Sequence, residues 1–270
     1  MVKKIETSDA WRVLEETSRT FVIPIRRLQG DLQTAVMASY LCMRAIDEIE
    51  DHPELEPGLK INLLQRVADG IQENKSFSKL FAPYADRLPE VTLLLDEWLK
   101  LLPAAVLSKV GAFVSEMASG MAKWTEKNWK IETVDDLDDY TYYVAGLVGV
   151  MLSELWIWYD GTKTKKDLAI AFGRGLQLVN ILRNKQEDEE RGVSFYPNQW
   201  GKPELTTYAL TQLRKAEEYI KSIKTKSIRE FCEIPLLLAF ATINTMEAQK
   251  EKLSREEVLG VVDSVIAKNA

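Results

Sequence analysis

Four carboxylates occupy five positions in the run from Arg44 to Asp51, directly after a largely apolar stretch. If the run is helical, 3.6 residues per turn place Asp47, Glu50 and Asp51 on one face, with Arg44 one turn earlier. Acids at these spacings repel one another in water, whereas Mg²⁺ takes oxygen ligands and typically bridges one or two carboxylates to a substrate phosphate. The cluster is therefore a candidate metal site; the alternative is a solvated acidic helix end before the breaker Pro53.

A second polar cluster lies about 130 residues downstream, in a segment otherwise rich in Leu, Ile and Val. Its members share one helix face, at i, i+3, i+7 and i+11: Gln177, Asn180, Asn184 and Asp188. Buried polar groups need partners, so the stripe requires polar company. We predict that the two clusters face each other across one cavity, whose metal ions and arginines bind a diphosphate.

The tetrapeptide Ser18-Arg19-Thr20-Phe21 places a hydroxyl, a guanidinium, a hydroxyl and an aromatic ring in a row. Pro24 follows and is expected to interrupt regular structure. The segment is either an ordinary loop or a flap that closes over a phosphate.

Tyr140 and Tyr143 lie on one predicted helix face with Gly146, and Gly149 follows one turn later. The small residues let a bulky neighbour approach the backbone, or they let a second helix cross closely. The spacing does not distinguish these two interpretations.

The composition is that of a soluble globular protein, with 46% hydrophobic residues, 28% charged residues and a net charge of -6. No basic stripe is present, which argues against nucleic acid as a partner. Cys42, Cys232 and the single His52 provide neither a disulfide framework nor a zinc ligand set. The N-terminus lacks the apolar core of a signal peptide, and no uninterrupted apolar run reaches about 18 residues. We therefore predict a cytoplasmic protein that is at most peripheral to a membrane.

Apolar residues recur with helical period along most of the chain, without Asn-Gly hairpin turns or sustained strand alternation. Prolines, glycines and capping residues delimit the predicted helices. They span residues 8–17, 30–51, 59–74, 88–101, 104–127, 134–156, 167–190, 205–224, 227–249 and 254–268. The sequence thus predicts an all-α fold, and its helical continuity predicts a single domain over residues 1–270.

The chain resembles the squalene/phytoene synthase family, and within it most nearly the squalene synthases, from about residue 8 to about residue 260. A single aspartate-rich box would be weak evidence, whereas five blocks in the family's order and at roughly its spacing are specific. The blocks are Ser18–Phe21, Tyr40–Asp51, Tyr140–Gly149, Asn180–Arg183 and Phe231–Pro235.

The resemblance implies a single-domain isoprenoid synthase helical fold with a central cavity, and head-to-head joining of two farnesyl diphosphates. In that family Mg²⁺ assists loss of one diphosphate, and the second molecule captures the allylic cation as a cyclopropyl diphosphate of the presqualene type. A second ionisation with rearrangement leads to squalene, dehydrosqualene or a related C30 product. Release of so apolar a product suggests a peripheral membrane contact.

NADPH supplies hydride in the squalene synthases, whereas dehydrosqualene synthases lose a proton instead. The basic segment that follows Pro235 in reductive members is represented at best by residues 250–255. The sequence therefore leaves the use of NADPH open.

Carried over by position, the resemblance implies three sets of site residues. The implied metal ligands are Asp47, Glu50, Asp51, Asn184, Glu187 and Asp188. The implied substrate-binding residues are Ser18, Arg19, Phe21, Tyr40, Arg44, Tyr140, Gln177, Asn180 and Arg183. The implied catalytic residues are Tyr143, Asp47, Asp51 and Asp188.

The chain departs from the family pattern at Asn184, where the second metal box normally begins with aspartate. An amide oxygen can ligate a hard cation but brings no charge, so the second side of a metal cluster would be weakened. The alternatives are ionisation without coupling, as in a prenyl diphosphate phosphatase or a terpene synthase, or a non-catalytic prenyl-lipid binding protein. The complete first box argues against the last of these.

Overall fold

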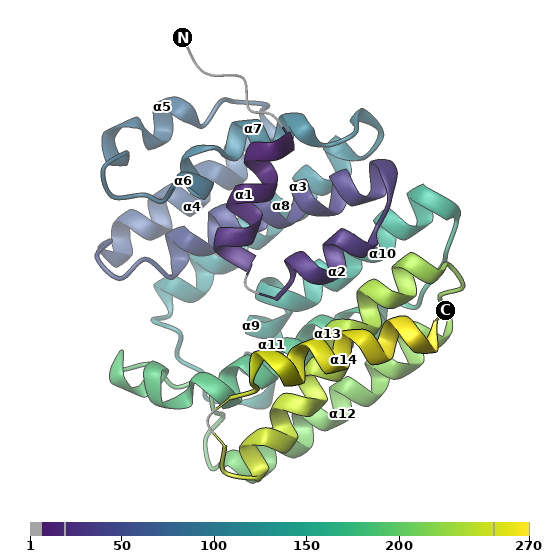
Figure 1. Cartoon of the computed structure of the whole chain (residues 1–270). Coiled ribbons are helices and arrows are strands. Elements are labelled where there is room, and N and C mark those ends of the chain that lie inside the picture. The colour runs from purple at the N-terminus through teal and green to yellow at the C-terminus, as the bar shows by residue number, and fades with distance from the viewer. Residues whose placement is uncertain (1–6, 19, 251, 270) are drawn as a thin grey trace. The chain divides into compact units, whose positions relative to one another are not determined.

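The computed structural model describes residues 7–18, 20–250 and 252–269, and helices are the only regular structure in these ranges (Figure 1). The predicted all-α fold is confirmed. The chain divides into two compact units, Met1–Asn128 and Trp129–Ala270. The single domain over residues 1–270 stays a prediction.

The N-terminal unit is built around α3 (Gly30–Glu50), which contacts six other helices of the unit. Thirteen of its residues are buried, from Leu32 at its start to Glu50 at its end, because neighbours cover it on several sides. The first acid cluster thus stands on the best-packed helix of this unit. The other elements are α1 (Thr7–Ser18), α2 (Val22–Arg27), α4 (Pro57–Gln72), α5 (Ser78–Phe81), a 3-10 turn (Ala82–Tyr84), α6 (Glu90–Leu93), α7 (Leu95–Leu101) and α8 (Ala104–Glu126).

Two details of this unit differ from the sequence prediction. Pro24 does not interrupt regular structure but lies in the first turn of α2, where a missing N–H removes no helical hydrogen bond. The predicted helix 88–101 is divided into α6 and α7. The indole Nε1 of Trp98 donates to the Val91 carbonyl at 2.8 Å, which is the acceptor that Leu95 would use in a continuous helix.

The C-terminal unit is built around α11 (Lys166–Glu190), which contacts the helices on either side of it in the sequence. The second polar cluster therefore also stands on the central helix of its unit. Its other elements are α9 (Val134–Thr141), a π-helical turn (Tyr142–Gly146), α10 (Leu147–Asp160), α12 (Lys202–Lys221), α13 (Lys226–Glu247) and α14 (Arg255–Lys268). Capping boxes open α9 at Thr133 and α14 at Ser254, and the second of these was predicted from the sequence.

Glycines let α11 cross the π turn and α10 with backbone against backbone. A Cβ on Gly149 would lie 2.1 Å from the Ala169 carbonyl oxygen, and one on Gly173 would lie 2.0 Å from the carbonyl oxygen of Ala145. Real Cβ atoms are not found at such distances from backbone. The structure thus decides between the two interpretations of the Tyr140–Gly149 glycines in favour of a tight helix crossing.

Among the described residues, one segment, Val134–Asp160, is long and apolar enough to cross a membrane by length and composition. Half of the residues in its most apolar 18-residue stretch are buried. The π turn interrupts it, and its glycines pack directly on the α11 backbone. A buried core helix meets the same criteria of length and composition. We therefore interpret this segment as part of the core of the C-terminal unit.

The crossing predicts that Gly149→Ala lowers the free energy of unfolding by about 3 kcal/mol, since the added methyl group meets backbone that cannot rotate away. Urea unfolding followed by circular dichroism measures the change. Gly260→Ala is the control, because an added Cβ in α14 meets no atom within 4 Å. It should leave stability unchanged or raise it by up to about 1 kcal/mol. Equal stability of the two variants would contradict the tight crossing.

Candidate functional site

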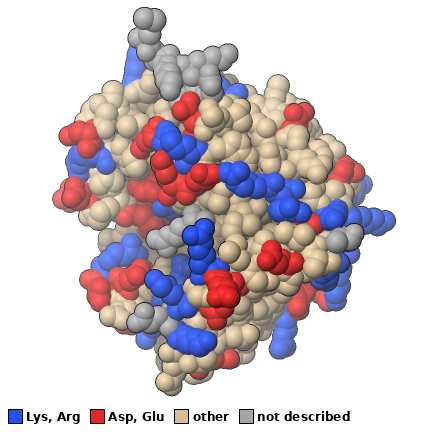
Figure 2. All heavy atoms as spheres, in the orientation of Figure 1, with Lys and Arg blue, Asp and Glu red and all other residues tan. Residues whose placement is uncertain are grey.

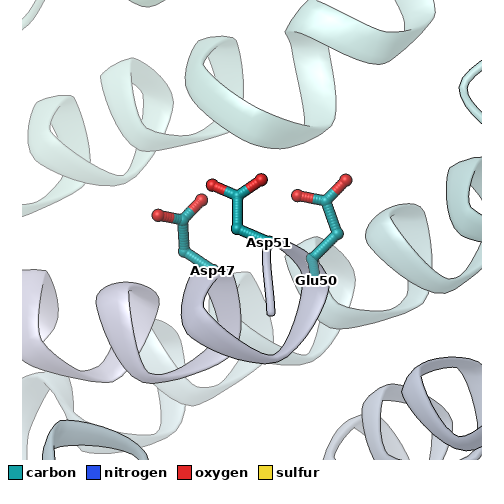
Figure 3. Close-up of side chains that lie close together, drawn as sticks. All are labelled: Asp47, Glu50 and Asp51. Carbon is teal, nitrogen blue, oxygen red and sulfur yellow. The ribbon is translucent and has the colours of Figure 1, made fainter. Parts of the chain in front are cut away.

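The first acid cluster gathers three carboxylates at the C-terminal end of α3 (Figure 3). One ligand oxygen each from Asp47, Glu50 and Asp51 lies within 4.8 Å of the other two. The helical period accounts for the arrangement, as predicted, because Asp47 precedes Glu50 and Asp51 by three and four residues. The donor set consists only of carboxylate oxygens, which suits a hard cation such as Mg²⁺.

The burial of this cluster argues against the solvated helix end considered above. Glu50 is only 3% exposed and Asp47 is half-buried, whereas Asp51 is exposed. No basic residue lies in the last turn of α3, and the negative pole of the helix dipole disfavours acids there. Without a cation the cluster therefore destabilises its own helix end, and a bound cation would remove that cost.

Crowding changes the protonation of Asp47. Burial, with the nearby charge of Asp51, raises the pKa of Asp47 to about 7, although Arg44 opposes the shift. A cation that binds near neutral pH would displace this proton, because only the carboxylate is a good ligand. The arrangement thus fits a site that is completed by a metal ion rather than by the chain itself.

Arg44 is held against the acids on its own helix. Its guanidinium donates through Nη1 to Asp47 at 2.5 Å and through Nη2 to Glu48. The third nitrogen, Nε, is buried and has no hydrogen-bond partner among the described residues. Arg44 is thus a cation held beside the acid cluster, and its role in diphosphate binding stays a prediction.

Two supports of this cluster were not predicted from the sequence. Lys60 on α4 is buried and its Nζ donates to the Glu50 carbonyl at 2.6 Å, which places a positive charge at the negative pole of α3. His52 fixes the turn after Asp51, because its Nδ1 accepts from the Glu54 backbone N–H and its Nε2 lies 3.0 Å from the Arg87 carbonyl. The helical pattern of the sequence around Lys60 indicates neither the Lys60 contact nor the His52 contacts.

The face of α3 that carries Asp47 also carries Tyr40, one turn before Arg44. The Tyr40 hydroxyl donates to the Thr17 carbonyl at 3.5 Å, and its ring lies 6.0 Å from the ring of Phe21. Ser18 is buried and its Oγ accepts from the Val22 backbone N–H at 3.1 Å. The structure thus places the Phe21 ring beside that of Tyr40, and it places Ser18 next to Thr17, whose carbonyl accepts from Tyr40. Arg19 lies outside the described residues.

The second cluster is arranged along α11 and is more solvated than the first. Gln177, Asn180 and Asn184 are half-buried, Glu187 is exposed and Asp188 is buried. Asp188 accepts from Arg191 Nη2 at 2.6 Å, and the Asn184 Oδ1 accepts from Arg183 Nε at 3.0 Å. The side-chain oxygen of Asn184 is thus engaged by the neighbouring arginine. That contact is consistent with a weaker metal side here, which stays a prediction.

Tyr196 lies beside this cluster and was not among the predicted site residues. Its hydroxyl is buried and has no hydrogen-bond partner among the residues that the structure describes. Burial, together with the charges of Glu189 and Asp188, raises its pKa to about 12, so the phenol stays protonated. A buried, unpaired donor next to an acidic box is a candidate substrate contact. The short distance from Asp188 along the chain was the only sequence signal.

The two predicted tyrosines differ in their surroundings. Tyr140 is buried and stacks on Phe195, with ring centroids 4.7 Å apart. Tyr143 stands in the π turn, half-buried, with its ring 5.3 Å from that of Tyr142. π turns inside helices often mark functional positions, which supports Tyr143 over Tyr140 as a residue that acts on substrate.

Arg174 also lies on the polar face of α11, one turn before Gln177, but it is used structurally. It donates to Thr141 Oγ1 at 3.1 Å and pairs with Asp138, which also accepts from the Tyr208 hydroxyl. This network ties α9, α11 and α12 together. The position one turn before the stripe is therefore occupied by a structural ion pair.

Comparison with known proteins identifies the family. The sequence profile of squalene/phytoene synthases matches residues 14–204, which is more than half of the chain and includes both clusters. The chain belongs to the squalene/phytoene synthase family. One similar relative is the squalene synthase of Schizosaccharomyces pombe, which is 31% identical over 269 residues. The match covers 86% of this chain and 58% of that protein. Rat squalene synthase is 29% identical over 86% of this chain and 62% of its own length. The chain thus spans about three fifths of the length of these relatives.

Solved structures support the fold of this family member. The structure of TcSQS with the ligand BPH1237 has a TM-score of 0.79 at 22% identity and covers 96% of this chain and 85% of that chain. A dehydrosqualene synthase with a ligand has a TM-score of 0.68 at 20% identity, over 97% of this chain and 95% of that one. The predicted isoprenoid synthase helical fold is confirmed.

The charge crowding at α3 predicts that Mg²⁺ raises the melting temperature of the wild-type protein and that Asp51→Asn removes most of this rise. Without metal, the variant should melt at the same temperature as the wild type or slightly higher, because a repulsive charge is lost. Thermal unfolding across a Mg²⁺ titration measures both effects. Asp69→Asn, an exposed acid on α4, is the matched control and should keep the full response. A full Mg²⁺ response in Asp51→Asn would exclude Asp51 as a ligand.

Proposed function

We propose that this chain is a prenyltransferase that joins two farnesyl diphosphates head to head in an Mg²⁺-dependent reaction. The observation that carries the proposal is the group of three carboxylates at the end of α3, which lies inside the stretch matched by the family profile. The product is a C30 hydrocarbon such as squalene or dehydrosqualene, formed through a cyclopropyl diphosphate. The substrate chain length is carried over from the resemblance.

Asp47, Glu50 and Asp51 would hold the first metal side, and Asn184, Glu187 and Asp188 the second. Mg²⁺ bound there supplies charge neutralisation of the diphosphate, which turns it into a leaving group. The two clusters would have to face one cavity for this, and that arrangement stays a prediction. The neutral Asn184 makes the second side the weaker one.

The chain's own cations and hydroxyls bind the diphosphate in this proposal. Arg44 has a buried Nε with no partner among the described residues, and Arg183 is exposed on the second cluster. Tyr40 stands on α3 and donates to the carbonyl of Thr17, the residue before Ser18. Phe21 packs beside Tyr40. Phe21 would then form part of a cover that excludes water from the reacting carbon. Arg19, which lies outside the described residues, keeps its predicted role as a diphosphate binder.

Tyr143 would act on the carbocation. Its ring face can stabilise positive charge on the allylic carbon, and its hydroxyl can donate a hydrogen bond to the departing diphosphate or relay a proton. Its half-buried position in the π turn supports this role, because a tyrosine sealed in the core could not reach substrate. Asp188, Tyr140, Gln177 and Asn180 complete the proposed substrate and catalytic set.

The membrane location and cofactor use follow from the same chemistry. We propose that the enzyme works in the cytoplasm at the surface of a membrane, where its apolar product can leave water. NADPH would be needed only for a reduced product. Lys250, in the basic segment considered above, is exposed and lies 3.8 Å from Glu257.

The test is incubation of purified protein with farnesyl diphosphate and Mg²⁺, with and without NADPH, followed by extraction and mass analysis. A C30 hydrocarbon is expected, and it should disappear with Asp51→Asn or with removal of Mg²⁺. Farnesol or a cyclic sesquiterpene would show that the substrate is ionised without coupling, which is the alternative based on Asn184. No product, with farnesyl diphosphate still bound, would indicate a prenyl-lipid binding protein.

The role assigned to Asn184 predicts that Asn184→Asp lowers the Mg²⁺ concentration needed for half-maximal turnover and raises the coupling rate about tenfold, which corresponds to about 1.4 kcal/mol of barrier. The reason is the added ligand charge, which raises affinity for Mg²⁺. Initial rates across an Mg²⁺ titration measure both quantities. Gln186→Glu adds the same charge to an exposed position of α11 and should change neither. Equal or lower coupling in Asn184→Asp would favour the hydrolytic or cyclising alternative.

A further inference from the structure

One end of the C-terminal unit combines exposed apolar side chains with exposed lysines. The last turn of α10 presents Ile157, which is 38% exposed, and Tyr159, which is 40% exposed, with the partly exposed Trp158 between them. Because three consecutive residues of a helix point in different directions, their shared exposure means that the tip of α10 protrudes from its unit. These are two of the four large hydrophobic residues found exposed in the described chain.

Five exposed lysines lie on the two segments next to this tip. Lys163 and Lys165 belong to the loop between α10 and α11, and Lys166 is the first residue of α11. Lys224 lies in the connection between α12 and α13, and Lys226 is the first residue of α13. The two segments touch, because the Thr225 hydroxyl donates to Asp160 at the end of α10. On the face drawn in Figure 2 the acidic and basic side chains of the described residues are interspersed, and the chain carries a net charge of -6. A group of five lysines next to a protruding apolar tip therefore departs from the general surface.

The lysines stand where the helices themselves disfavour them. Lys165 and Lys166 occupy the N-cap and first position of α11, and Lys226 is the first residue of α13. The positive pole of the helix dipole lies there and favours acids, so these lysines do not serve the stability of their own helices. The exposed acids of the loop region are Asp160, which accepts from Thr162 and Thr225, and Asp167. Lys226 lies 3.9 Å from Glu230. The lysines and the two helix N-termini together make this end positive.

The tip is presented from a rigid base. The Trp156 indole donates to the Tyr219 hydroxyl at 2.9 Å, and Ser153 lies 2.9 Å from the same hydroxyl. The Thr164 hydroxyl donates to Ser153 at 2.8 Å, which ties the lysine loop to α10. All of these residues except Thr164 are buried. The exposed turn and loop are therefore held in place together.

We propose that this end of the C-terminal unit, made of Ile157, Trp158, Tyr159 and the five lysines, docks on the surface of an anionic lipid bilayer. Trp and Tyr favour the level of the lipid headgroups, and Ile157 at the tip reaches the acyl boundary. The lysines are attracted to the anionic headgroups. Lipid is favoured over an acidic protein or a nucleic acid because the apolar tip protrudes rather than forming a groove or a flat stacking surface. This docking surface deepens the membrane location proposed above and rests on it, but it does not depend on the proposed reaction.

The test is co-sedimentation of the full chain with vesicles of phosphatidylcholine alone and of phosphatidylcholine mixed with phosphatidylglycerol. Binding is expected only to the anionic vesicles, and it should weaken as salt is raised. The triple substitution Lys163→Glu, Lys165→Glu, Lys166→Glu should lower the partition coefficient at least about tenfold. Acids suit the start of α11, so this variant should fold. The double substitution Ile157→Ser, Tyr159→Ser should also weaken binding without changing charge.

The matched control reverses three exposed lysines elsewhere, with Lys75→Glu, Lys79→Glu and Lys215→Glu. It carries the same net charge as the loop variant and should bind vesicles like the wild type. Absence of wild-type binding to anionic vesicles, or equal loss in the control variant, would overturn the proposal. C30 formation in vesicle-free buffer should be unchanged in the loop variant. Failure of the proposed reaction would leave the vesicle result unaffected, so the two proposals fail separately.

Discussion

The mutual repulsion of carboxylates at the C-terminal end of α3 is the constraint on which the proposed site depends. Three acids share a few ångströms of space at the negative pole of a helix, and one of them is buried. Such an arrangement persists because the rest of α3 is held by packing on several sides, which supplies more stabilisation than the acids remove. Arg44 and the buried Lys60 offset part of the charge. The remainder calls for a cation from outside the chain.

A polar site on a well-packed helix is also found in α11. Its polar stripe can exist because glycines allow α11 to pack backbone against backbone on the π turn and α10. Dispersion contacts at such short range are numerous, and they hold the stripe on the central helix of its unit. The crossing also explains the segment Val134–Asp160, whose apolar composition serves packing. A π turn at the crossing gives Tyr143 a different direction from the one that an uninterrupted helix would give it.

Charge is used in opposite senses at the two ends of helices in this protein. Acids gather at the C-terminal end of α3, and lysines gather at the N-terminal ends of α11 and α13. Each group opposes the dipole of its helix, so neither is explained by helix stability. Positions that lower local stability are often those used for binding, because a ligand of opposite charge then gains what the helix lost. A divalent cation suits the first group and an anionic surface suits the second.

The sequence by itself determined the fold class, most helix positions, the family and the first acid cluster. These depend on local periods and on ordered motifs, so Asp47, Glu50 and Asp51 could be placed on one face without knowledge of the tertiary fold. Asn184 as a departure was also visible in the sequence. Only the tertiary structure decided that the glycines near Tyr143 serve a helix crossing, that Lys60 caps α3 and that Trp98 divides α6 from α7. It also decided that the Tyr196 hydroxyl, beside Asp188, has no hydrogen-bond partner among the described residues. Each of these rests on burial or on contacts that lie outside the regular helical repeat, and neither leaves a periodic signal in a single sequence.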